Sequence, residues 1–285
     1  AEGKNVAHQV KKMDLSSIIH LRDRLLLNDR VSDEDIPKFP YLQLEKGSAE
    51  HEYLHSRRKE LHGYLPQRTA NFSGEFAVPK LGDFESLLTE QSREISTTLA
   101  FVRALNILLK NKSIGEQIVP IIADEARTFG MEGLFRQIGI YNPHGQNYVP
   151  QDREGVSYYK EATSGQVLQE GINELGSIAS WVAAATSYST HDLPMVPFYI
   201  FYSMFGFQRV GDMTWLAGDQ QARGFLLGAT AGRTTLNGEG LQHEDGHSHI
   251  LAGTVPNPQS EIICLCLEAG AMQSKQGLVT FYIYQ

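Results

Sequence analysis

Apolar residues follow a helical spacing in some stretches of the chain and form short continuous runs in others. Helical spacing near the start predicts one helix over residues 14–27. A second helix is expected over residues 49–62, where acidic residues come first and basic residues follow, as the helix dipole favours. Prolines punctuate the sequence around both helices. Residues 1–80 are therefore expected to be a charged lead-in of helices and loops.

From residue 81 onward, helical and strand-like segments alternate. Apolar residues at positions 95, 99, 102, 105 and 109 predict a long amphipathic helix. Further helices are expected over residues 173–185 and 208–216, and strands over residues 118–123, 195–201, 224–227 and 278–284. Because strands alternate with helices, residues 81–285 are predicted to form an α/β domain whose mostly parallel sheet is covered by helices.

Three segments of possible functional interest follow predicted strands. They are the pair Asp124 and Glu125, the stretch from Tyr202 to Phe205, and the histidine-rich stretch 238–249. In open parallel sheets, ligands bind outside the carboxyl ends of the strands. We therefore expect these segments to face one crevice.

The histidine-rich stretch holds three histidines and three carboxylates in twelve residues. So many groups that titrate near neutral pH are typical of the wall of an active site. The sequence from His243 to His247 also matches the zinc-protease pattern H-E-x-x-H, which needs a helix, whereas Gly238, Gly240 and Gly246 disfavour one. A loop that lines the pocket of an organic ligand is the favoured interpretation. A zinc hydrolase and a solvated loop without chemistry remain as alternatives.

Glu174 allows two interpretations. It precedes an alanine-rich apolar segment, so its carboxylate can simply lie in the first turn of a helix and interact with the dipole. A buried carboxyl at this position would instead share a proton with a ligand, for example with a ring nitrogen. Tyr202 and Phe205 are core aromatics by default, but their place at a strand end also suits stacking on a flat ring.

Composition and charge narrow the class of protein. With 285 residues, 41% hydrophobic and 20% charged, the chain has the composition of a globular protein. A net charge of −8 argues against nucleic acid or an anionic membrane as partner, and no apolar run is long enough to span a bilayer. Cys264 and Cys266 are too close for an ordinary disulfide, as expected for a reducing cytoplasm. The start at Ala1, in polar sequence, indicates a piece of a larger protein.

Several long segments resemble one enzyme family. They comprise residues 121–135, 169–176, 217–225 and 233–250. These segments resemble the homodimeric bacterial pyruvate dehydrogenase component of the pyruvate dehydrogenase complex. The similarity continues nearly unbroken from residue 1 to about residue 258.

The resemblance implies a thiamine diphosphate enzyme with the transketolase-like layout. Residues 81–285 would be its pyrimidine-binding domain, and residues 1–80 would carry an active-site loop and a helical linker. The implied reaction is oxidative decarboxylation of pyruvate with reductive acetylation of lipoyl groups. The implied partners are pyruvate, the lipoyl domain of dihydrolipoamide acetyltransferase, and a second copy in a full-length homodimer. A non-catalytic module for docking or dimerisation is the remaining alternative.

The resemblance also implies how the cofactor is held. Glu174 matches the carboxylate that hydrogen-bonds the ring nitrogen of the aminopyrimidine, which is a catalytic as well as a binding role. Tyr202 and Phe205 match aromatics that flank the pyrimidine. Asp124 belongs to the same set of cofactor-binding positions.

Four further residues match catalytic positions of the family. Glu125 and His243 match groups near the reacting centre, and Glu239 lies in the same loop as His243. His8 matches a histidine on a mobile loop that takes part in acetyl transfer to lipoamide.

Two departures from the family pattern limit what this chain is expected to do. The Gly-Asp-Gly motif for magnesium and diphosphate is absent, so the magnesium ligands are expected outside this chain and none is assigned within it. After Pro258 the family pattern is lost. The isolated chain is therefore expected to be inactive.

Overall fold

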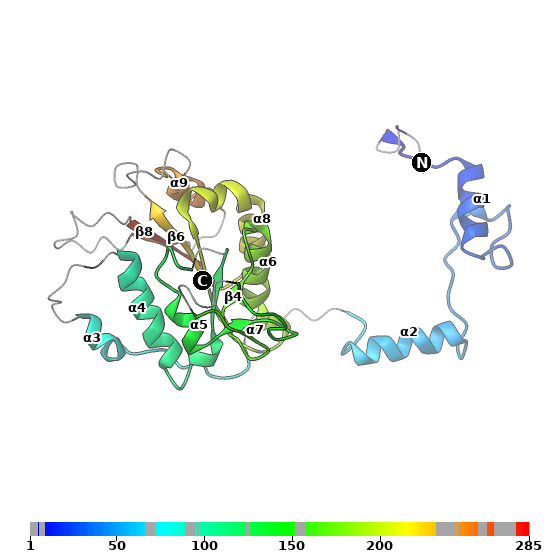
Figure 1. Ribbon diagram of the computed structural model, residues 1–285. Coiled ribbons are helices and arrows are strands. Elements are labelled where there is room, and N and C mark those ends of the chain that lie inside the picture. The colour runs from blue at the N-terminus through cyan, green and yellow to red at the C-terminus, as the bar shows by residue number, and fades with distance from the viewer. Residues whose placement is uncertain are drawn as a thin grey trace. The chain divides into compact units, whose positions relative to one another are not determined.

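A computed structural model of the chain describes residues 5, 9–65, 72–88, 95, 97–123, 126–151, 158–231, 243, 245–255, 261–264 and 278–284 (Figure 1). The chain divides into two compact units, Ala1–Gln67 and Arg68–Gln285. The different functions expected for residues 1–80 and 81–285 stay a prediction.

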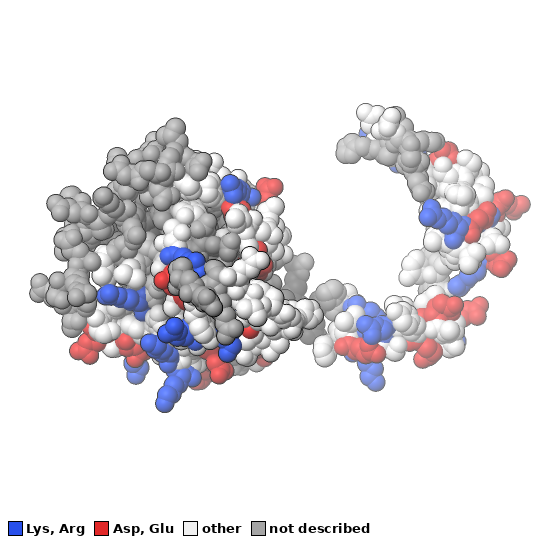
Figure 2. Space-filling model, in the orientation of Figure 1, with Lys and Arg blue, Asp and Glu red and all other residues white. Residues whose placement is uncertain are grey.

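The first unit contains the helical lead-in expected from the sequence. Its helices are α1 (Leu15–Arg24), η2 (Ile36–Lys38) and α2 (Ala49–Glu60). Asp14 and Ser48 cap α1 and α2 by accepting hydrogen bonds from backbone N–H groups in the first turn. Neither α1 nor α2 has a buried residue, and acidic and basic side chains lie interspersed along them in Figure 2. Packing therefore contributes little to either helix.

The second unit is built on a six-stranded sheet with the order β4-β1-β5-β6-β8-β7. The strands are β1 (Ile118–Ile122), β4 (Leu168–Gln169), β5 (Val196–Tyr202), β6 (Gly224–Ala231), β7 (Glu261–Cys264) and β8 (Leu278–Tyr284). The first four strands in this order are parallel, and β8 and β7 join antiparallel at one edge. The mostly parallel sheet is confirmed.

Helices cover both faces of this sheet (Figure 1). The described helices of this unit are η3 (Leu81–Phe84), α3 (Glu85–Leu88), α4 (Thr97–Lys110), η4 (Gly115–Gln117), α5 (Gly133–Gln137), α6 (Glu174–Ala185), α7 (Ser187–Thr190), η5 (Ser203–Phe205), α8 (Phe207–Asp219) and α9 (Ser248–Ala252). A small parallel pair, β2 (Ile140–Tyr141) and β3 (Glu161–Ala162), lies beside them. None of the described helices has the length and apolar composition that a membrane span requires.

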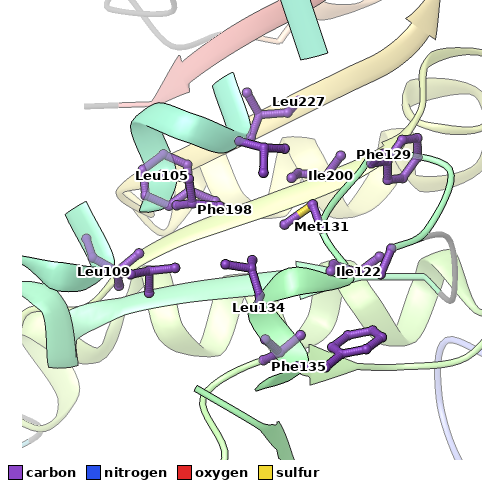
Figure 3. Close-up of a cluster of buried hydrophobic side chains, with 14 of the residues drawn as sticks. Leu105, Leu109, Ile122, Phe129, Met131, Leu134, Phe135, Phe198, Ile200 and Leu227 are labelled. Atoms are coloured by element: carbon purple, nitrogen blue, oxygen red, sulfur yellow. The ribbon is translucent and has the colours of Figure 1, made fainter. Parts of the chain in front are cut away.

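Alternate residues of the central strands enter two different cores. In β5, Phe198 and Ile200 pack with α4 and α5, whereas Tyr199 and Phe201 pack with α6 and α8. Figure 3 shows the first core, in which Leu105 of α4 lies beside Phe198. Because both faces are buried, β5 is apolar along its length and lacks the alternation of a half-exposed strand.

Candidate active site

A cleft of about 160 Å³ lies at the carboxyl ends of β1 and β5. Strand β5 contributes three residues to it, and the other surrounding segments contribute the rest. Its lining is Ala123, Phe129, Ile172, Glu174, Ile200, Phe201, Tyr202, Phe205, Arg209 and His243. The place of this cleft agrees with the crevice expected from the ends of the strands.

Glu174 is the first residue of α6, directly after the cap residue Asn173, whose side chain accepts a hydrogen bond of 3.0 Å from the Gly176 N–H. The Glu174 side chain is 13% exposed, so it lies in the cleft and not in open solvent. Arg209 Nη1 donates to Glu174 Oε1 over 2.5 Å. Glu174 therefore lies in the first turn of α6 and also lines the cleft, and its role toward a ligand stays a prediction.

Three rings form a wall of the cleft. The His243 ring centroid lies 4.9 Å from that of Tyr202 and 5.5 Å from that of Phe205. The guanidinium of Arg209 lies 4.0 Å from the Phe205 ring centroid, in the geometry of a cation–π contact. Together these groups offer flat faces and one carboxylate, a combination suited to a heteroaromatic ring.

A close approach of the backbone brings Phe205 to this wall. The chain turns from β5 into α8 through η5 and Gly206. A Cβ atom on Gly206 would lie 2.0 Å from the Phe201 ring, so only glycine fits there. The turn places Phe205 and Arg209 on the cleft within one short segment.

The segment after His243 is anchored beneath the same wall. Asp245 is buried and accepts hydrogen bonds from the backbone N–H groups of His247 and Ser248, at 3.0 and 3.1 Å, and from the hydroxyl of Ser203. Burial opposes ionisation of this carboxyl, but these hydrogen bonds outweigh it and hold the pKa of Asp245 below its usual value.

Of the residues proposed from the sequence, the structure brings Glu174, Tyr202, Phe205 and His243 together on one cleft. Their chemical roles stay predictions. The other four lie outside the described residues and comprise His8, Asp124, Glu125 and Glu239.

Arg209 and Asp245 were missed by sequence reasoning. Arg209 lies in the first turn of α8, where the helix dipole disfavours a cation, and this misfit was a usable signal. Asp245 stands three residues before Ser248, the first residue of α9, and accepts a hydrogen bond from the N–H two residues on, as in an Asx turn. Their partners are distant in sequence, so no local pattern names them.

The zinc alternative loses its geometric basis. The H-E-x-x-H pattern requires both imidazoles on one helix, but α9 begins at Ser248, after both His243 and His247. Across the described part of the chain, no group of three or more His, Cys, Asp or Glu side chains is arranged to hold a metal ion.

The fold and the cleft define an open α/β domain with a cleft at the carboxyl ends of its parallel strands, the place where sheets of this class bind ligands. Residues 79–282 match the family model described as the pyruvate dehydrogenase E1 component middle domain. The chain belongs to this family.

Similar curated proteins are named pyruvate dehydrogenase E1 component. The chain is 70% identical to the pyruvate dehydrogenase E1 component of Escherichia coli over 257 residues, which cover 90% of this chain and 29% of that protein. The component of Haemophilus influenzae is 65% identical and that of Pseudomonas aeruginosa 57%, over the same shares. A solved transketolase from Campylobacter jejuni aligns with a TM-score of 0.42 at 17% identity, covering 86% of this chain and 30% of that chain. The chain thus spans less than a third of the length of these curated relatives.

Proposed function

We propose that this chain is the pyrimidine-binding part of a pyruvate dehydrogenase E1 component. The full-length protein would decarboxylate pyruvate and transfer the acetyl unit to lipoyl groups. The observation that carries this proposal is the position of Glu174, which is largely buried in a cleft walled by aromatic rings. Family membership and 70% identity to a relative of that name support it.

The cleft fits one ring of thiamine diphosphate. Its volume of about 160 Å³ is below the roughly 300 Å³ at which pockets for drug-sized ligands begin. A single aminopyrimidine ring suits such a space, whereas the diphosphate would extend beyond it. We therefore propose that magnesium and the diphosphate are held by residues outside this cleft.

In this proposal, Glu174 holds a proton at the ring nitrogen. Arg209 engages one carboxylate oxygen, Oε1, and the second oxygen is the one we assign to the ring nitrogen. Tyr202 and Phe205 orient the flat ring by contact with its faces. When bound, the cofactor supplies the electron sink that decarboxylation of a 2-oxo acid requires.

His243 is the proton-transferring group of the proposed site. It lies against Tyr202 and Phe205 at the edge of the cleft, and an imidazole accepts and donates protons near neutral pH. Glu125 and Glu239 are proposed near the reacting centre, and Asp124 is proposed to contact the cofactor. His8, in the lead-in, is proposed to assist acetyl transfer.

The proposed partners follow from this activity. They are pyruvate, the lipoyl domain of an acetyltransferase, and a second copy of the full-length chain in a homodimer. A cytoplasmic location is proposed with them.

The test is acetylation of lipoamide by the full-length protein, with and without Glu174→Ala. We expect the substitution to lower kcat by about 10²-fold or more, since a positioned acid or base contributes about that much, and to weaken thiamine diphosphate binding. Glu116→Ala, an exposed acid of the same domain, is the matched control and should behave as the parent protein. Unchanged activity in the Glu174 variant would refute the proposal, and no cofactor binding by the parent protein would favour a non-catalytic module.

A further inference from the structure

One carboxylate is buried beneath the aromatic wall of the cleft. Asp245 is 7% exposed, and the other buried polar residues of the described chain are serines and threonines. Two of those, Ser203 and Ser248, surround it. An ionised carboxylate is costly to bury unless hydrogen bonds replace the water that it loses. Asp245 accepts such hydrogen bonds from two separate segments of the chain.

The bonds of Asp245 join segments that are far apart in sequence. Its Oδ2 accepts from the Ser203 hydroxyl, and its Oδ1 accepts from the N–H groups of His247 and Ser248. In return, the Ser248 hydroxyl donates over 3.1 Å to the backbone carbonyl of Ser203. Two of these hydrogen bonds, from Ser203 to Asp245 and from Ser248 to Ser203, thus hold the start of α9 against η5, and the other two fix the turn that precedes α9.

Both joined segments carry rings of the cleft wall. Ser203 follows Tyr202 and lies two residues before Phe205, while Asp245 lies two residues after His243. Each of the three rings therefore lies only one or two positions in sequence from Ser203 or Asp245.

Gly228 of the neighbouring strand β6 leaves space for the Ser203 side chain. A Cβ atom on Gly228 of β6 would lie 2.9 Å from the Ser203 hydroxyl oxygen and 3.1 Å from its Cβ. Ser203 thus packs directly on the backbone of β6 and has little freedom to move. Asp245 is therefore hydrogen-bonded to a serine whose position is constrained by β6.

We propose that Asp245 is a positioning residue that holds His243 in place against Tyr202 and Phe205. This inference rests on the proposed function, because it acts through the ring that the proposal places at the reacting centre. Asp245 itself is absent from the lining of the cleft, so it acts from behind the wall.

A double-mutant cycle in the full-length protein separates positioning from mere stability. Asp245→Asn keeps the shape of the side chain and removes its charge, so we expect kcat to fall about tenfold or more, as small displacements of reacting groups do. In a His243→Ala background, the same substitution should have no further effect on kcat, because its target is gone. Asp219→Asn, an exposed acid on α8, is the control and should leave kcat unchanged. Thermal unfolding of each variant reports on stability.

Each outcome decides between defined alternatives. If Asp245→Asn leaves kcat unchanged, or lowers it equally in both backgrounds, Asp245 does not act through His243 and the inference is wrong. If His243→Ala alone leaves lipoamide acetylation unchanged, the proposed role of His243 fails first. Ser203→Ala removes one hydrogen bond only, and takes the place of Asp245→Asn in the cycle should that variant fail to fold.

Discussion

At the scale of the residue, the cleft depends on close approaches that glycine alone permits. Gly206, directly before α8, lies against the Phe201 ring, whereas Gly211, within α8, has open space at its Cβ position. The two positions therefore form a matched pair in which the same substitution meets opposite surroundings.

Gly206→Ala should destabilise the domain by about 1–3 kcal/mol, because the new methyl group forces Phe201 or the backbone to move. Gly211→Ala should be neutral or stabilise by up to about 1 kcal/mol through helix propensity. The measurement is thermal unfolding of both variants beside the parent protein. Equal shifts of the melting temperature would show that the turn after β5 is not tightly packed.

Asp245 predicts a dependence of stability on pH. Its pKa is lower in the folded protein than the ordinary value of 3.8, so the folded state binds this proton less readily than the unfolded state. The stability that it contributes is fully present above the unfolded value and is lost as pH falls through the folded value. Denaturant unfolding at neutral pH and below pH 4 should show a smaller acid loss in Asp245→Asn than in the parent. An identical loss in both would argue against an ionised Asp245.

At the scale of the element, each helix over the sheet is fixed by a few buried side chains. Trp181 of α6 is fully buried, and its Nε1–H donates over 3.1 Å to the carbonyl of Phe225 in β6. Trp181→Phe should cost about 1–3 kcal/mol, since it removes that hydrogen bond and part of the buried ring, and Trp181→Ala about 3–5 kcal/mol. Trp215→Phe on the exposed side of α8, where the tryptophan is 50% exposed, should stay within about 0.5 kcal/mol. Comparable losses from Trp181→Phe and Trp215→Phe in thermal unfolding would contradict this assignment.

The sequence predicted the elements well where a period extended over many residues. The helix at α6 and the strand at β5 lie within one or two residues of their expected bounds. The strand at β6 was predicted to end at residue 227 but continues to Ala231, because residues 228–231 lack large apolar side chains and their pairing with β5 and β8 is tertiary. The helix expected from residue 95 begins at Thr97.

The cleft could be predicted in part. Placing Tyr202, Phe205 and His243 in one crevice needed only the rule that parallel strands end at one edge. Arg209 needed more, because its partner Glu174 comes from another helix, 35 positions away. The Ser203–Asp245 bond spans 42 positions and becomes evident only when η5 and the start of α9 are seen together.

For the molecule as a whole, we propose that this chain carries one part of a larger active site. It spans 29% of the Escherichia coli relative, and its cleft has space for a single ring. Under the proposed function, we expect other residues of the full-length protein to hold the remainder of the cofactor. In the same proposal, His8 of the lead-in would assist the acetyl-transfer step.

The most direct test of the central claim is a crystal structure of the full-length protein with thiamine diphosphate bound. We expect the pyrimidine ring to lie against Tyr202 and Phe205, with its ring nitrogen about 2.6–3.0 Å from a carboxylate oxygen of Glu174. A pyrimidine bound elsewhere, with Glu174 still paired to Arg209 alone, would contradict it.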